Sequence, residues 1–155
     1  PPRRGRRLML AEIEQSLVAH IQASPLAERL RAVDALPDLE GDSLVATFGA
    51  EAPAVYVALG GGDLANGAAA PLIGVACVAR NSRSPRAARQ GDGLQIGLLQ
   101  LVEEVVALLD GAFIDGLHYH TLRWDPVASE ALYRKGLYAA VVQLTTFLPL
   151  PFVAA

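Results

Sequence analysis

Hydrophobic residues recur at helical spacing near the start of the chain. The series is Leu10, Ile13, Leu17 and Ile21, with mostly polar residues in the positions between. A repeat of three to four residues places these side chains on one side of a helix. Ser24 and Pro25 are typical of a boundary where one helix ends and another short turn begins. The pattern therefore predicts an amphipathic helix in the first part of the chain.

A second and stronger helical series follows the middle of the chain. Its apolar residues are Leu94, Leu98, Leu101, Val102, Val105, Leu108 and Leu109. Asp92 is the expected cap at its start, with Gln95 three residues further on, and Gly111 is the expected stop. We expect a helix over residues 94–109.

Apolar and β-branched runs between and after these helices predict strands. A short strand followed by a turn is expected within residues 29–43, and longer strands are expected within 52–62, 71–81, 117–124 and 137–148. The run at 71–81 is apolar on both faces, which is typical of a central strand. In the last strand the residues expected to share a face are Tyr138, Ala140, Val142, Leu144 and Leu148.

The connections between the strands are rich in glycine and polar residues. Segment 60–70 is predicted to be a hairpin connection longer than a two-residue turn, and segment 81–93 a polar loop. The expected order is α-β-β-β-α-β-β. This order predicts an α+β fold of two layers, with a mostly antiparallel sheet packed against two helices.

The chain length and composition fit one domain. Its 155 residues are 52% hydrophobic, and the net charge is −3. We expect a single domain over residues 9–155, preceded by an extension, 1–8, with no role in the core. The lone cysteine, Cys77, excludes an internal disulfide and is expected to be a small buried hydrophobe.

The uncharged segment 136–155 is long enough to be considered as a membrane anchor. However, Gln143 lies in the middle of this segment, and Pro149 and Pro151 interrupt a helix. Its β-branched and aromatic residues favour a strand that leads into a proline-containing tail. We therefore expect no membrane contact.

The glycine run at Gly60, Gly61 and Gly62 resembles a phosphate-binding loop only superficially. Such a loop opens onto a helix, and the P-loop also requires a Lys followed by Ser or Thr. Here Asp63 follows directly, without that Lys and without a helix start. The composition instead favours a hairpin that contacts another chain, and we expect no nucleotide cofactor.

Few residues are arranged for catalysis. His118 and His120 fall on one face of a predicted strand, but a catalytic zinc site also requires a third protein ligand. Asp115 and Asp125 are the nearby carboxylates. The simpler interpretation is a half-exposed strand face, so we expect neither a metal nor an enzyme, and a small metal-binding or enzymatic module using the two histidines remains an alternative.

Four arginines recur at every third position along the polar loop, namely Arg80, Arg83, Arg86 and Arg89. One interpretation is a solvated loop. The other is a binding loop, because long loops on a rigid scaffold often carry function. Four charges bind nucleic acid weakly, but a ring of subunits would multiply them.

The order of these segments resembles a known family. The series "MLAEIEQSLVAHI", "LRAVDALPDL", "APAVYVALGGG", "CVARNSRSPRAARQGDG", "LLQLVEEVVALLDG" and "LYRKGLYAAVVQLTTF" is similar to the tail terminator or tail completion proteins of Mu-like phages and prophages. The resemblance extends from Met9 to Leu148. The extension at residues 1–8 departs from it.

The resemblance implies a structural virion protein without catalytic activity. Proteins of this kind form a hexameric ring that caps the head-proximal end of the tail tube, stops its polymerisation and joins it to the head connector. The implied partners are copies of the chain itself, the tube protein, the connector protein and DNA passing through the lumen. The implied location is the tail–neck junction of the virion, after assembly in the host cytoplasm. Another neck or head–tail joining protein is the alternative.

A closed ring requires two different matching surfaces on each subunit. One candidate subunit interface is the apolar tail segment Pro149, Leu150, Pro151 and Phe152. The arginines of segment 80–89 are candidates for an interface or for the lumen. Residues Gly60 to Asp63 are the candidate hairpin contact.

Overall fold

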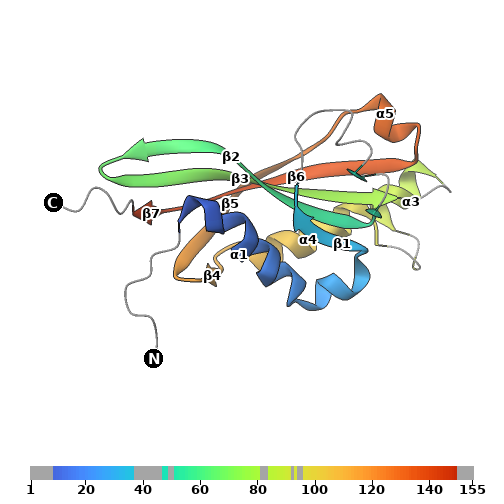
Figure 1. Cartoon of the computed structure of the whole chain (residues 1–155). Coiled ribbons are helices and arrows are strands. Elements are labelled where there is room, and N and C mark those ends of the chain that lie inside the picture. The colour runs from blue at the N-terminus through green and yellow to red at the C-terminus, as the bar shows by residue number, and fades with distance from the viewer. Residues whose placement is uncertain are drawn as a thin grey trace.

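In the part of the chain that the structure describes, seven strands form one curled sheet (Figure 1). The structure is a computed structural model, and it describes residues 9–36, 47–48, 51–80, 84–91, 93 and 96–149. The strands are β1 (Ala32–Ala35), β2 (Ala54–Ala65), β3 (Ala68–Arg80), β4 (Phe113–Ile114), β5 (Leu117–Pro126), β6 (Leu137–Thr146) and β7 (Leu148–Pro149). Their order across the sheet is β1-β2-β3-β6-β5-β4, and β7 pairs with β3.

The pairing is antiparallel except at one edge. β1 runs parallel to β2, with Val33 opposite Val55, and every other recorded pair is antiparallel. The apolar strand β3 lies between β2 and β6, as its sequence predicts. A mostly antiparallel α+β fold is thus confirmed.

Helices α1 (Leu10–Gln22) and α4 (Leu98–Leu109) lie over one face of the sheet (Figure 1). The predicted first helix is confirmed, and after Ser24 it is followed by the 3₁₀ helix η1 (Pro25–Arg29). Two shorter helices, α3 (Pro85–Gln90) and α5 (Glu130–Tyr133), were not predicted from the sequence.

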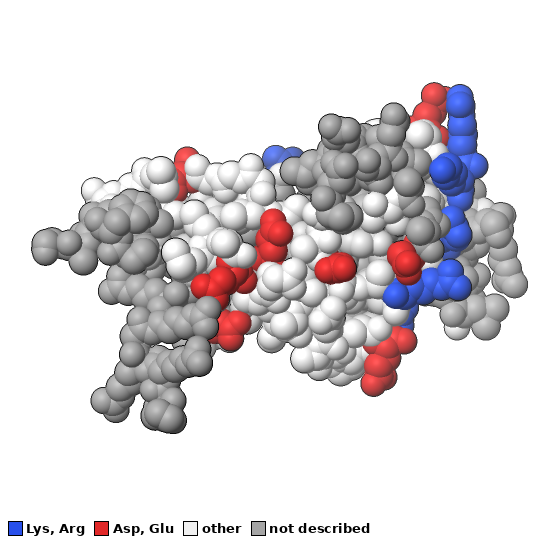
Figure 2. All heavy atoms as spheres, in the orientation of Figure 1, with Lys and Arg blue, Asp and Glu red and all other residues white. Residues whose placement is uncertain are grey.

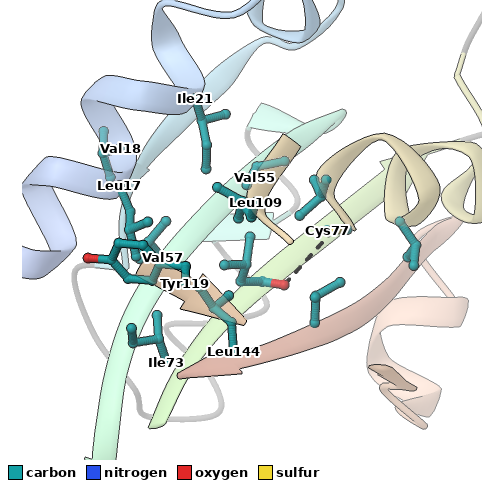
Figure 3. Packing of buried hydrophobic residues seen from close by; sticks show 14 of the residues in the cluster. Leu17, Val18, Ile21, Val55, Val57, Ile73, Cys77, Leu109, Tyr119 and Leu144 are labelled. Carbon is teal, nitrogen blue, oxygen red and sulfur yellow. Dashed lines mark hydrogen bonds between the residues drawn. The ribbon is translucent and has the colours of Figure 1, made fainter. Parts of the chain in front are cut away.

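The main core lies between these two helices and the sheet. Figure 3 shows Leu17 of α1 and Leu109 of α4 gathered in one cluster with Val57, Tyr119 and Leu144 of the sheet. All five side chains have no exposed surface. Burying one side chain of this size contributes roughly 1.5–3 kcal/mol, so this layer supplies much of the free energy of folding. The predicted shared face of β6, from Tyr138 to Leu144, packs here.

A second, smaller core covers part of the opposite face. Leu132 of α5 and Phe48 pack there with strand residues that include Tyr56, whose ring stacks on Phe48 at 5.6 Å between centroids. The prediction of two layers with two helices is therefore incomplete, and the predicted element order is wrong in detail. The cause is that α5 spans only four residues, too few to show a helical repeat in the sequence.

The second main helix begins four residues later than predicted. α4 starts at Leu98, and the N–H of Gly97 donates to Gln100 Oε1 at 3.0 Å. A Cβ at Gly97 would lie 2.1 Å from the backbone nitrogen of Gly91, so the chain crosses itself tightly here. The expected cap residues Asp92 and Gln95 lie outside the described residues.

Cys77 is fully buried within β3, as predicted (Figure 3). Burial raises the pKa of its thiol to about 12. Among the described helices, none is long and apolar enough to cross a membrane.

Candidate interaction surfaces

The glycine-rich segment is part of a continuous hairpin of two long strands. We call residues 60–72 the arm; it projects past the helices in Figure 1. Pairing continues to Ala65 opposite Ala68, so only Asn66 and Gly67 form the turn. Their φ angles of 51° and 76° are those of a tight type I′ turn. The prediction of a long connection is wrong. A strand is recognised by alternating apolar and polar side chains, and the glycines of this segment have no side chains to alternate.

The glycines allow the two strands of the arm to approach closely. A Cβ at Gly62 would lie only 2.4 Å from the carbonyl oxygen of Ala70. A register shift between Leu59 and Gly61 adds a bulge at Gly60. Gly60, Gly61, Gly62 and Asp63 are all exposed. All four lie within strand β2.

Three contacts hold the arm to the body, two toward its base and one beside its turn. The N–H of Leu59 donates to Glu14 Oε1 at 2.8 Å, which ties β2 to α1. The hydroxyl of Thr145 donates to the carbonyl of Pro71 at 2.8 Å, which ties β3 to β6. Strand β7 pairs with Ala68 and Ala69. The arm is therefore an extension of the sheet that is anchored to the body by these contacts. Its Leu64 is 74% exposed and can contact another chain.

The predicted arginine loop is partly helical. Arg80 closes β3, and α3 exposes Arg86 and Arg89, which lie three residues apart and thus on one side of the helix. Arg86 Nε donates to Gln90 Oε1 at 3.2 Å. Arg83 lies outside the described residues. A six-residue helix escapes prediction because it is shorter than two turns.

Two further basic residues lie at the same end of the molecule. Arg134 and Lys135 follow α5 and precede β6, whose first residue, Leu137, pairs with Arg80. Ser129 caps α5, because its hydroxyl oxygen accepts a hydrogen bond from the N–H of Leu132 at 3.3 Å. The sequence analysis did not single out Arg134 and Lys135. The signals in the sequence are those of the short helix before them, namely Ser129 followed by Glu130 at its start and Gly136 after its end.

The proposed tail interface can be described only at its first residue. Pro149 is exposed and belongs to β7, next to Ala68 of the arm. Leu150, Pro151 and Phe152 lie outside the described residues.

His118 and His120 lie on one exposed face of β5, as predicted. The ring of His118 packs on Phe113, with 4.5 Å between centroids. The described residues contain no group of three or more His, Cys, Asp or Glu side chains able to hold a metal ion.

Exposed aromatic residues surround these histidines and were missed by sequence reasoning. Phe113 pairs with His118, and Thr145 pairs with both His120 and Leu72, which places these side chains on one face. Phe147 follows two residues after Thr145, in the link between β6 and β7. Phe113 and Phe147 are 63% and 66% exposed. Such an apolar patch on a soluble domain is typical of an interaction site.

A shallow hollow of about 500 Å³ lies beside β1. Its lining includes Arg31, Asp34, Glu51 and Tyr56. Burial, followed by the charges of Glu51 and Asp34, raises the pKa of the Tyr56 hydroxyl. The opposite charges around this hollow favour no particular small ligand.

The fold and these surfaces define a small α+β domain with a projecting hairpin and exposed charged and aromatic patches. The family model described as "Bacteriophage Mu, Gp37" matches residues 9–139, which is most of the chain. The chain therefore belongs to the bacteriophage Mu Gp37 family and is a protein of Mu-like phages. No curated protein matches the sequence.

Proposed function

We propose that this protein is a tail terminator. In this role it forms a ring of identical subunits that caps the head-proximal end of the tail tube and stops its polymerisation. The ring also joins the tube to the connector of the head, and it acts through contacts rather than catalysis. The observation that carries the proposal is membership of the Mu Gp37 family over residues 9–139.

The shape of the subunit supports a role in assembly. A closed ring uses two different surfaces on each subunit, one matching the other. The arm extends one end of the sheet, while α3 and α5 lie at the other end of β3 (Figure 1). The molecule thus offers distinct surfaces for a neighbouring subunit, the tube protein and the connector protein.

The arginines of α3 are the described residues best suited to DNA in the lumen. Arg86 and Arg89 are exposed, and a sixfold ring would present each of them repeatedly to a passing duplex. Contacts of this kind are independent of base sequence and weaken as salt rises. The proposed location is the tail–neck junction of the virion.

Polymerisation of the purified tube protein tests this function. With the terminator present, tubes should stop growing, and electron microscopy should find a ring at one end of each tube. A chain that stays monomeric and leaves tube length unchanged would contradict the proposal. A chain that binds the isolated connector but never a tube end would instead assign it to the head side of the joint.

A further inference from the structure

One edge of the arm is open to solvent. The pairing of β1 with β2 ends at Val57, and among the described residues no other strand lies beside that edge of β2. Residues 60–66 are all exposed. By contrast, β7 and the hydroxyl of Thr145 cover the other edge of the arm, at Ala69 and Pro71. An uncovered strand edge presents backbone N–H and C=O groups that a further strand can bind.

This open edge lacks the usual protection against pairing. Edge strands commonly carry Lys or Pro, which discourage a second strand. Residues 60–66 contain neither, and Asp63 is the single charged residue of the arm, which is largely white in Figure 2. The bulge at Gly60 lies at the base of the arm and leaves residues 61–65 in regular register. The edge is therefore suited to bind an extended segment of another chain.

The register shows which backbone groups of the arm point outward. Ala65 and Ala68 flank the two-residue turn, so they form a hydrogen-bonded pair, and from there bonded and non-bonded pairs alternate. Gly62 is opposite Pro71, which has no N–H, and this is a non-bonded pair. The N–H and C=O of Gly62 therefore point away from β3, toward the open edge.

A second open edge lies on β5, on the side away from β6. β4 and a hydrogen bond from the N–H of Thr121 to Asp110 cover its beginning, but no strand in the described part of the chain pairs with it from residue 122 onward. The N–H of Val127 donates to β6 at 2.9 Å, so alternation turns the N–H and C=O of Trp124 outward. Pro126 ends this edge, since it has no N–H. The open part is therefore short and centred on Trp124.

Opposite charges come together when the two edges are set side by side. In an antiparallel register with Gly62 opposite Trp124, Asp63 is directly opposite Arg123. Asp63 is exposed, and the side chain of Arg123 is 64% exposed. Arg123 already contacts Asp125 of its own strand at 2.7 Å. A guanidinium has five N–H donors, so it can lie between the two carboxylates and bind both.

Apolar side chains meet on the other face of the same pairing. Gly62 has no side chain, so the indole of Trp124, which is 47% exposed, has room above it. Leu64 follows two residues after Gly62 and becomes a diagonal neighbour of Trp124, within reach of an aromatic ring. Leu64 is 74% exposed, so the pairing would remove two large apolar side chains from water.

We propose that the open edge of the arm pairs with the open edge of β5 in the next copy, so that the sheet continues from subunit to subunit. This inference rests on the proposed ring, and it assigns the two different surfaces that a heterologous contact requires. Two identical arms suit each other less, because an antiparallel pair centred on Asp63 sets like charges opposite each other. Within one chain the two edges cannot meet, since β3 and β6 lie between β2 and β5.

Cysteine cross-linking tests this contact. The variant Asp63→Cys with Arg123→Cys places one thiol on each edge, and opposite residues of an antiparallel pair have Cα atoms about 4.5–5.5 Å apart, within the range of a disulfide. Cys77 is fully buried. Mild oxidation of the rings should link the chains into covalent oligomers on a non-reducing gel. The control is Asp63→Cys with Glu103→Cys, whose second thiol is at an exposed position of α4 and should link at least about fivefold less.

The single tryptophan of the chain reports the same contact in the unmodified protein. Quenching of Trp124 by acrylamide should fall at least about twofold when rings assemble, because the neighbouring arm removes the indole from water. Rings that give no cross-link above the control, or that leave the quenching unchanged, would overturn the pairing. An unmodified chain that forms no ring, alone or with tubes, would overturn the proposed function itself.

Discussion

Cys77 illustrates how burial decides the chemistry of a single residue. Its thiol has a pKa of about 12 because the side chain is fully removed from water. The thiolate is the reactive form, so the folded protein should react slowly with a thiol reagent, with no marked rise between about pH 7 and pH 9. Ellman's reagent measures this rate. In urea the reaction should become fast, and rapid labelling of the folded chain would contradict the placement of Cys77.

A second prediction at the residue scale compares two leucines. Leu101 of α4 is fully buried, whereas Leu64 of the arm is 74% exposed. Leu101→Ala should lower the free energy of unfolding by about 2–5 kcal/mol, because it leaves a cavity in the core. The same substitution at Leu64 should change it by about 0.5 kcal/mol or less. Urea denaturation measures both, and equal losses would contradict the assigned core.

At the scale of elements, the arm depends on Gly62. A Cβ there would meet the carbonyl oxygen of Ala70 at 2.4 Å, and its φ of +155° is disfavoured for other residues. Gly62→Ala should therefore weaken the pairing of the arm locally, by about 1–3 kcal/mol.

The matched control for this prediction is Gly60→Ala. A Cβ at Gly60 would meet its nearest atom, the carbonyl oxygen of Leu72, at an ordinary 3.7 Å. Hydrogen exchange of the arm amides should accelerate at least about fivefold in Gly62→Ala and much less in Gly60→Ala. Equal exchange in both variants would mean that the close approach at Gly62 is not needed.

The elements that the sequence predicts well are those with a long repeat. α1 carries a strong helical repeat and lies where expected, and β3 covers the predicted apolar run but begins three residues earlier, at Ala68. The short elements α3, α5 and β4 span six residues or fewer, so their patterns are too brief to detect. The arm was mistaken for a loop because glycine and alanine provide no alternation of large apolar and polar side chains.

The candidate surfaces were predicted only in part for a related reason. Arg86, Arg89 and the glycines of the arm stand out in the sequence by spacing or composition. The placement of Arg134 and Lys135 at the same end as Arg80 depends on strand register, since Leu137 pairs with Arg80. Pairing between residues that are distant in sequence is not visible in one sequence without an alignment.

At the scale of the whole molecule, the buried core joins the projecting arm to the opposite end of β3, where α3 and α5 lie. The core fixes the distance between the ends, since β3 passes through the middle of the sheet and reaches both. The proposed contact of Arg86 and Arg89 with DNA in the lumen should weaken as salt rises, and binding of duplex DNA at two salt concentrations measures this.

The proposed role of the protein is to cap the head-proximal end of the tail tube. The most direct measurement is cryo-electron microscopy of tail tubes assembled with this protein, with an antibody fragment bound to it as a marker. The account predicts a ring of marked subunits on one end of each tube, the end that joins the head. Marked density spread along the tube, or absent from both ends, would contradict it.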